Sequence, residues 1–254
     1  MKKYKIVTTI FAKLCVQFIF TITKTLLPVN KKKVVFASYR SEKLTGNLLY
    51  VYNEFLSRNY KFKYIFLMKK YKSSILGKLD YFIHLIVASY HLATSKLFVI
   101  DDYYFPVYVI KPRKDTSIIQ LWHAAGAFKK FGHSTIGKDF GPSKDYLQHV
   151  KVHSNYSYAI VSASEVIPYF AEAFNMPEDR ILPLGVPRTD YFFDKNEERR
   201  LKDRFYKEYP SFSKKRILLY APTFRGKSHH QKKFECPLDF GKLKESCNGD
   251  FILL

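Results

Sequence analysis

One short segment holds the residues best suited to chemistry. It reads IIQLWHAAGAFKKFG and carries, in order, Trp122, His123, Gly126, Lys129 and Lys130. A histidine at a strand end can take a proton from a hydroxyl near neutral pH. Small residues let a backbone approach a ligand closely, and lysines suit phosphate oxygens. The segment predicts a site for a phosphate and a hydroxyl, although a structural histidine and a solvated lysine pair would share this pattern.

Two later segments hold arginines that could grip phosphate. LGVPRTD contains Gly185, which permits a tight turn, followed by Arg188 and Asp190. Arg188 can bind phosphate bidentately while Asp190 fixes its guanidinium, and a purely structural turn with a local Arg–Asp pair is the alternative. APTFRG places Arg225 after another expected strand. Arg225 is a second phosphate candidate, with a salt bridge between domains as its alternative.

The charge of the chain favours anionic partners. Its 254 residues include 43 Lys or Arg against 22 Asp or Glu, a formal net charge of +21. Such a charge suits nucleic acid, an anionic membrane face or phosphate-rich substrates. No helix-turn-helix, RNA-binding or zinc-finger pattern occurs in the sequence, so we expect no nucleic-acid partner.

The cysteines and histidines predict neither a metal site nor a cofactor. Cys15, Cys236 and Cys247 are odd in number and lack C-x-x-C spacing. His229 and His230 are adjacent, and no third ligand accompanies them. We therefore expect no metal, no cofactor, and reduced thiols of the kind found in the cytoplasm.

The N-terminal segment 1–30 is basic and apolar. Every charged residue before Glu42 is a lysine or arginine, and the uncharged run 14–23 is flanked by Lys13 and Lys24. That run is shorter than the roughly 20 residues needed to cross a bilayer, and no signal-peptide cleavage site follows it. We expect the segment to lie on a membrane surface. An ordinary first helix packed on the domain is the alternative.

Apolar runs alternate with helical patterns along the rest of the chain. Strands are expected at 33–39, 63–68, 97–101, 117–123, 158–163, 181–185, 216–222 and 249–254. Helices are expected at 47–59, 79–90, 164–175 and 197–209. The strand at 97–101 leads into the acidic pair Asp101 and Asp102. This alternation predicts an α/β fold with a doubly wound parallel sheet.

The pattern also predicts how the chain divides. Residues 31–212 form one Rossmann-like domain, and 213–254 begin a second, after the membrane-associating segment 1–30. The chain stops inside an apolar strand pattern, and two Rossmann-like halves need on the order of 100 or more further residues. We therefore expect the sequence to be truncated relative to a complete enzyme.

The order of motifs resembles the CDP-glycerol:polyglycerophosphate glycerophosphotransferase family of teichoic-acid synthesis. The resemblance is carried by VVFASY, LFVIDD, IIQLWHAAGAFKKFG, VSASEVIPYFAEAF, ILPLGVPRTDYFF and ILLYAPTFRG. It runs from about Lys33 to the last residue. The family is similar to GT-B glycosyltransferases, whose two Rossmann-like halves face each other.

The resemblance implies an acceptor-side domain at 31–212 and a donor-nucleotide domain from 213. His123 would be the general base on a hydroxyl of a lipid-linked anionic acceptor, which attacks the β-phosphate of CDP-glycerol or CDP-ribitol and releases CMP. Trp122, Gly126, Lys129, Lys130, Arg188, Asp190 and Arg225 would bind substrate. The protein would be peripheral on the cytoplasmic face of the bacterial cell membrane.

Family members continue with an Arg/Lys-x-His-Pro segment and an Asp-Tyr-Ser-Ser-like segment, and neither occurs here. We therefore expect this chain alone not to turn over the donor. A sugar-nucleotide glycosyltransferase of the same architecture is one alternative function. A non-catalytic basic module that binds a membrane surface is another.

Overall fold

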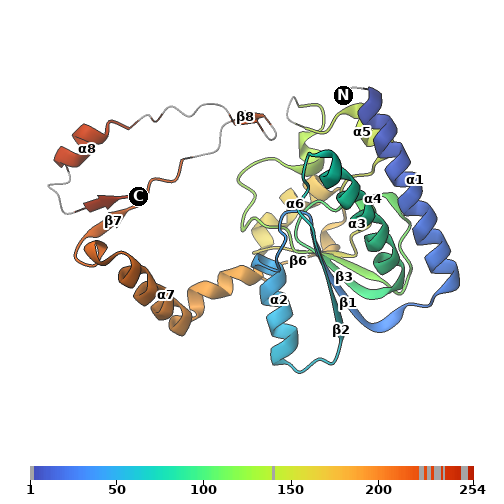
Figure 1. Cartoon of the computed structure of the whole chain (residues 1–254), viewed down its shortest axis with the longest axis horizontal. Coiled ribbons are helices and arrows are strands. Elements are labelled where there is room, and N and C mark those ends of the chain that lie inside the picture. The colour runs from blue at the N-terminus through green and yellow to red at the C-terminus, as the bar shows by residue number, and fades with distance from the viewer. Residues whose placement is uncertain are drawn as a thin grey trace. The chain divides into compact units, whose positions relative to one another are not determined.

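The computed structural model describes residues 3–138, 141–222, 226–227, 230–231, 236, 238–246 and 251–254. The chain forms two compact units, Met1–Asp190 and Tyr191–Leu254 (Figure 1). This division precedes the predicted domain boundary at 212/213. The charged helix α7 (Lys195–Glu208) buries none of its residues and packs on the following 3₁₀ turn η5 (Pro210–Phe212), so it groups with the second unit.

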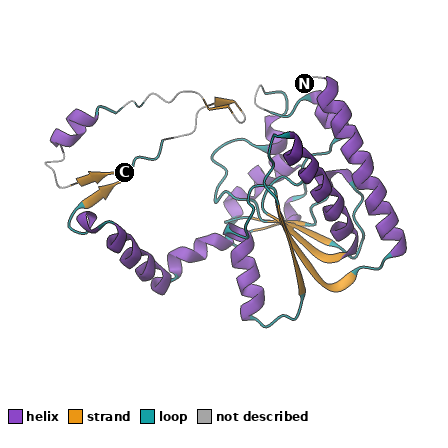
Figure 2. Cartoon of the chain, in the orientation of Figure 1, coloured by secondary structure: helices purple, strands orange, loops and turns teal. Residues whose placement is uncertain are grey.

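The first unit is built on a six-stranded sheet with the strand order β2-β1-β3-β4-β5-β6 (Figure 2). All neighbouring strands are parallel. The strands are β1 (Asn30–Ser38), β2 (Lys63–Met68), β3 (Ser95–Ile100), β4 (Ser117–Gln120), β5 (Tyr158–Ile160) and β6 (Ile181–Leu182). The predicted parallel α/β sheet is confirmed. The chain adds β2 on one side of β1 and then adds β3 and the later strands on the other side. The position between β1 and β3 is therefore a switch point, where open α/β sheets bind their ligands.

Helices cover both faces of this sheet. Val35 and Phe98 pack on one face with helices α1 (Lys3–Leu26), α3 (Ile75–Thr94), α4 (Phe105–Val109) and α6 (Ile167–Phe174). Val34 and Val99 point to the other face, which α2 (Gly46–Ser57) covers. Successive strand residues thus alternate between two apolar cores, as burial on both faces requires. Short elements complete the unit: α5 (Lys144–His149) and the 3₁₀ turns η1 (Gly132–Thr135), η2 (Ser164–Val166) and η3 (Glu178–Arg180). The 3₁₀ turn η4 (Pro187–Phe193) begins in the first unit and ends in the second.

The N-terminal segment is a longer helix than the sequence predicted. Lys13 and Lys24 do not interrupt α1, and its part Ile6–Leu26 is long and apolar enough to cross a bilayer by length and composition. The helix is also held to the domain, because Val16 and Phe20 are buried in the core and Gln17 Nε2 donates to the Val109 carbonyl oxygen at 2.7 Å. These contacts pack α1 on the domain, and its lying on a membrane surface stays a prediction.

The second unit starts a new parallel sheet. Strands β7 (Arg216–Leu218) and β10 (Phe251–Leu253) pair in parallel, and α8 (Phe240–Ser246) lies between them in the chain. This is the strand–helix–strand order of a Rossmann-like unit. A separate antiparallel pair joins β8 (Gly226–Lys227) to β9 (His230–Gln231).

Candidate active site

Three strand ends bring charged side chains together at one edge of the sheet. Arg40 follows β1, Asp102 follows β3 and His123 follows β4. Asp102 Oδ2 lies 2.7 Å from Arg40 Nη1 and 3.2 Å from His123 Nδ1. This edge is the carboxyl end of the strands at the switch point, where open α/β sheets bind their ligands. We call Arg40, Asp102 and His123 the His123 site.

Hydrogen bonding leaves Nε2 of His123 free to accept a proton. Nδ1 faces two acceptors, the Asp102 carboxylate and the Asp101 carbonyl oxygen at 3.3 Å, so Nδ1 carries the proton of the neutral ring. No side chain or carbonyl in the described ranges bonds to Nε2. Burial lowers the pKa of His123 from its usual 6.5, Asp102 raises it and Arg40 lowers it again. A neutral imidazole with an open Nε2 has the properties of a general base.

The two neighbouring carboxyl groups have different surroundings. Asp102 is held by Arg40, by His123 and by the Tyr103 backbone N–H at 2.6 Å. Asp101 Oδ1 is buried without a hydrogen-bond partner among the described residues, and burial raises the pKa of Asp101 to about 6. Asp102 is therefore the carboxylate that orients His123, and Asp101 contributes its backbone carbonyl.

Trp122 supports the histidine ring. Its backbone has φ +51°, which is uncommon for a residue other than glycine. Two hydrogen bonds hold this turn: the Trp122 N–H donates to Gln120 Oε1 at 2.8 Å, and Asn47 Nδ2 donates to the Trp122 carbonyl oxygen at 2.9 Å. The indole is only 4% exposed and stacks on the imidazole at 4.5 Å. The indole therefore supports the His123 ring, and the predicted role of Trp122 in substrate binding stays a prediction.

Arg188 lies at the His123 site, and its binding of phosphate stays a prediction. Its guanidinium Nη2 donates to the His123 carbonyl oxygen, and its backbone N–H donates to Asn47 Oδ1 at 3.1 Å. Gly185, with φ +92°, makes the turn that leads into this segment. Asp190 does not fix Arg188: within the described ranges no ion pair joins them, and Asp190 lines a separate cavity beside α2.

The loop after His123 is open to solvent. Lys129 is exposed and has no ion-pair partner in the described part of the chain, whereas Lys130 lies 3.5 Å from Glu172. The three atoms nearest to a Cβ at Gly126 would belong to the ring of Phe128, which is itself 98% exposed. The role of Gly126 in substrate binding stays a prediction.

The remaining predictions from the sequence concern Arg225, a metal site and the cysteines. Arg225 lies outside the described residues. Within the described ranges, no group of three His, Cys, Asp or Glu side chains could hold a metal ion. Cys15 and Cys236 are free thiols.

Sequence reasoning missed two residues of the His123 site, Arg40 and Asp102, and also Asn47, which bonds to Trp122 and Arg188 beside it. The acidic pair after β3 was a usable signal, because charged residues that follow adjacent parallel strands meet at one edge of the sheet. Arg40 follows β1 in the same way. Asn47, buried at 3% exposure at the start of α2, has no such signal.

Known proteins share sequence with most of this chain. A family profile described as CDP-Glycerol:Poly(glycerophosphate) glycerophosphotransferase matches residues 19–254. The teichoic acid ribitol-phosphate primase of Bacillus spizizenii is 50% identical over 236 residues, which are 92% of this chain and 60% of the primase. The teichoic acid glycerol-phosphate primase of Bacillus subtilis is 32% identical over 67% of this chain and 43% of that protein. The chain thus spans about 60% or less of these relatives.

Solved structures share the fold. The wall teichoic acid polymerase TagF matches with a TM-score of 0.67 and 18% identity, covering 99% of this chain and 63% of TagF. A form of TagF soaked with CDPG matches with a TM-score of 0.70 and 19% identity, with the same coverage. The predicted GT-B-like fold is therefore confirmed. Because the family profile covers nearly the whole sequence, this chain belongs to the CDP-glycerol:poly(glycerophosphate) glycerophosphotransferase family.

Proposed function

We propose that this chain supplies the acceptor side of a transferase in teichoic acid synthesis. The enzyme moves a polyol phosphate from a CDP-activated donor to a hydroxyl of a lipid-linked anionic acceptor. The family assignment and the named roles of the relatives support this transfer over a sugar-nucleotide reaction. The observation that carries the proposal is His123, a half-buried and neutral imidazole with its Nε2 open at the switch point of the sheet.

The donor that we propose is CDP-ribitol rather than CDP-glycerol. The chain is 50% identical to a ribitol-phosphate primase and 32% identical to a glycerol-phosphate primase. The difference supports a polyol preference like that of the ribitol enzymes. Both donors present the same pyrophosphate, so the chemistry at His123 is the same for each.

The proposed reaction begins when the acceptor hydroxyl gives its proton to His123 Nε2. Its oxygen forms a bond to the β-phosphorus of the donor, the bond from that phosphorus to the bridging oxygen breaks, and CMP leaves with the electron pair. The Asp102 carboxylate, 3.2 Å from Nδ1, stabilises the imidazolium that results. The proton then passes to solvent.

Positive charge near His123 suits the anionic substrates. Arg188 keeps N–H groups beyond the one that bonds to the His123 carbonyl. Lys129 and Lys130 lie in the exposed loop that follows the histidine. We propose that these three side chains attract and place phosphate groups.

The test uses a hybrid enzyme. Residues 1–222 of this chain are joined to the C-terminal part of the Bacillus spizizenii primase, which supplies the length that this chain does not cover. The hybrid should release CMP from CDP-ribitol in the presence of a lipid-linked acceptor, more slowly from CDP-glycerol, and about 10²–10⁴-fold more slowly after His123→Gln. Normal release of CMP by a folded His123→Gln hybrid would contradict the proposal.

We also propose that the protein docks on the cytoplasmic face of the membrane through two helices rather than one. Helix α1 packs along α3 (Figure 1), and Phe11 stacks on Phe82 with ring centroids 5.8 Å apart. Both helices expose apolar side chains: Val7, Phe11, Leu14 and Phe18 on α1, and Leu76, Leu79, Ile83 and Val87 on α3. Exposed apolar side chains on neighbouring helices, with lysines nearby, are typical of surfaces that enter an anionic interface.

Point substitutions test this docking better than deletion of 1–30, because deletion would uncover the core that Val16 and Phe20 fill. Phe11→Glu and Leu79→Glu, one on each helix, should each weaken binding to phosphatidylglycerol vesicles about tenfold or more, since each removes an apolar contact of about 1.5–3 kcal/mol. Phe192→Glu, at a residue 70% exposed in the second unit, is the control. Equal vesicle binding by all three variants would refute the docking surface.

A further inference from the structure

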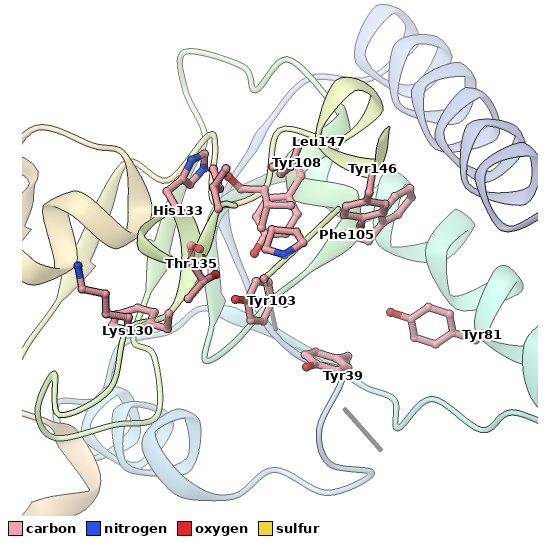
Figure 3. A pocket seen from close by; sticks show the side chains of 16 residues that line it. Tyr39, Tyr81, Tyr103, Phe105, Tyr108, Lys130, His133, Thr135, Tyr146 and Leu147 are labelled. Carbon is pink, nitrogen blue, oxygen red and sulfur yellow. Dashed lines mark hydrogen bonds between the residues drawn. The ribbon is translucent and has the colours of Figure 1, made fainter. Parts of the chain in front are cut away.

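A cavity of about 540 Å³ lies beside the His123 site, and of the residues proposed to act in the transfer only Lys130 lines it. Five tyrosines line it: Tyr39 after β1, Tyr81 on α3, Tyr103 after β3, Tyr108 on α4 and Tyr146 on α5 (Figure 3). Lys130 and His133 also contribute to the lining. Its volume is in the range of small-molecule binding sites.

The tyrosine hydroxyls are available to a ligand. In the described part of the chain, the hydroxyls of Tyr39, Tyr81 and Tyr146 make no hydrogen bond. Burial raises the pKa of Tyr39 and of Tyr146 to about 12, and it raises the pKa of Tyr81 as well. These hydroxyls therefore stay protonated at neutral pH, and each can donate and accept. Partly buried hydroxyls without partners favour a ligand that brings its own polar groups.

The cavity and the His123 site share a wall. The Tyr103 backbone N–H donates to Asp102, the carboxylate that holds His123. Trp122 stacks on His123 on one side and contacts Phe131 and Tyr103, both cavity residues, at ring distances of 5.0 and 5.5 Å. A molecule seated in the cavity would thus lie next to the group that reacts at His123.

The side chains that line the cavity favour some classes of ligand over others. A pyrophosphate would call for several cations, and Lys130 and His133 are the only basic side chains among the lining residues. A purely apolar chain would leave the three tyrosine hydroxyls without partners. A sugar ring or polyol satisfies both demands, because its C–H groups pack on aromatic faces while its hydroxyls pair with those of tyrosine.

We propose that this cavity binds a neutral, hydroxyl-rich sugar or polyol unit of the acceptor, next to the unit whose hydroxyl attacks. The inference rests on the proposed transfer to an acceptor at His123. It adds a site that fixes the acceptor beyond its reacting group, with Tyr39, Tyr81 and Tyr146 as its binding residues.

The single tryptophan gives a direct test on the 254-residue chain, because Trp122 touches two cavity residues. Glucose and ribitol, as ring and linear probes, are titrated while Trp122 fluorescence is recorded. At least one probe should give a saturable change. Tyr81→Phe and Tyr146→Phe should each raise its Kd about fivefold, the loss expected for one hydrogen bond. Tyr169→Phe, an exposed tyrosine outside the cavity, should leave the Kd unchanged.

The outcomes separate this inference from the proposed transfer. If neither probe gives a saturable change, or if the Tyr81→Phe and Tyr146→Phe variants bind as the parent does while keeping its melting temperature, the cavity is not a sugar or polyol site. His123→Gln should keep probe binding, because Nε2 does not line the cavity. If the chain binds a probe through its tyrosines but the hybrid never releases CMP, the proposed transfer is contradicted and the binding site is still supported.

Discussion

Replacing Asp102 by asparagine tests the electrostatic account of the His123 site. The Asp102 carboxylate takes hydrogen bonds at both oxygens, from Arg40 and His123 at Oδ2 and from the Tyr103 N–H at Oδ1. An amide has only one accepting oxygen. In either orientation of the asparagine its NH₂ faces an N–H donor, so the substitution removes both the charge and one partner.

The size of the effect follows from the 3.2 Å distance between Asp102 Oδ2 and His123 Nδ1. A charge pair at that distance is worth about 1.3 kcal/mol at the dielectric of water and about 5 kcal/mol at an effective value near 20. Arg40 offsets part of the carboxylate charge, and the His123 side chain is 33% exposed, so the lower figure is closer. Loss of about 1.3–2.7 kcal/mol from the protonated transition state lowers kcat about 10–100-fold.

The hybrid enzyme is assayed for CMP release across a pH range, with Asp101→Asn as the matched control. Asp101→Asn changes a carboxyl that does not touch His123 and keeps the carbonyl that does. In Asp102→Asn the pKa of His123 loses the influence that raises it, so the acid limb should move to lower pH while kcat falls. A folded Asp102→Asn enzyme with unchanged kcat and an unmoved acid limb would refute the reasoning.

Three further results are expected. CMP release by the unmodified hybrid should rise with pH through an acid limb below 6.5, because burial lowers the pKa of His123 and only the neutral ring is a base; a limb above that value would contradict the assignment. Burial lowers the pKa of His84 to about 4, so stability present above about pH 6.5 is lost as pH falls toward 4. The free energy of unfolding, measured with urea, should therefore be lower at pH 5 than at pH 7. His84→Gln should make this decrease smaller, by at most about 2 kcal/mol. Asn47→Ala removes the bonds to the Trp122 carbonyl and the Arg188 N–H and should cost about 1–3 kcal/mol in urea unfolding, whereas Asn53→Ala, exposed on the same helix, should cost little.

The sequence predicted the first strands of the sheet well and the later strand ends poorly. The expected strand at 63–68 has the bounds of β2, because its apolar run is closed by lysines on both sides. The expected strand at 117–123 ends early, at Gln120. Gln120 binds the Trp122 N–H, and the backbone turns left-handed at Trp122. That turn depends on a side chain within the strand and on Asn47 from another helix, which apolar periodicity does not encode.

Short helices were the other element that periodicity missed. Helix α4 spans Phe105–Val109, with Pro106 and two valines in five residues, which is a poor helical sequence. It forms because Val107 and Val109 are buried in the core. Tertiary packing therefore decides this helix, and local propensity does not.

For the site, the strand-end rule located His123 but gave no partner to the histidine. Asp102 was visible as part of an acidic pair, and its role depends on β3 lying beside β4 in the sheet. Arg40 depends in the same way on β1 lying beside β3. Strand order is a property of the whole fold, so residues that act across neighbouring strands are found only once the order is known.

Arg40 explains how His123 can lie against a carboxylate and still remain a base. A carboxylate 3.2 Å from an imidazole favours the protonated ring, and a protonated ring cannot accept the hydroxyl proton. Burial lowers the pKa of His123, and Arg40, bound to the same oxygen of Asp102, lowers it further. The carboxylate is left free to fix the Nδ1–H tautomer without holding the ring protonated. The proposed chemistry therefore uses three adjacent strand ends, one each for the base, the residue that orients it and the charge that keeps it neutral.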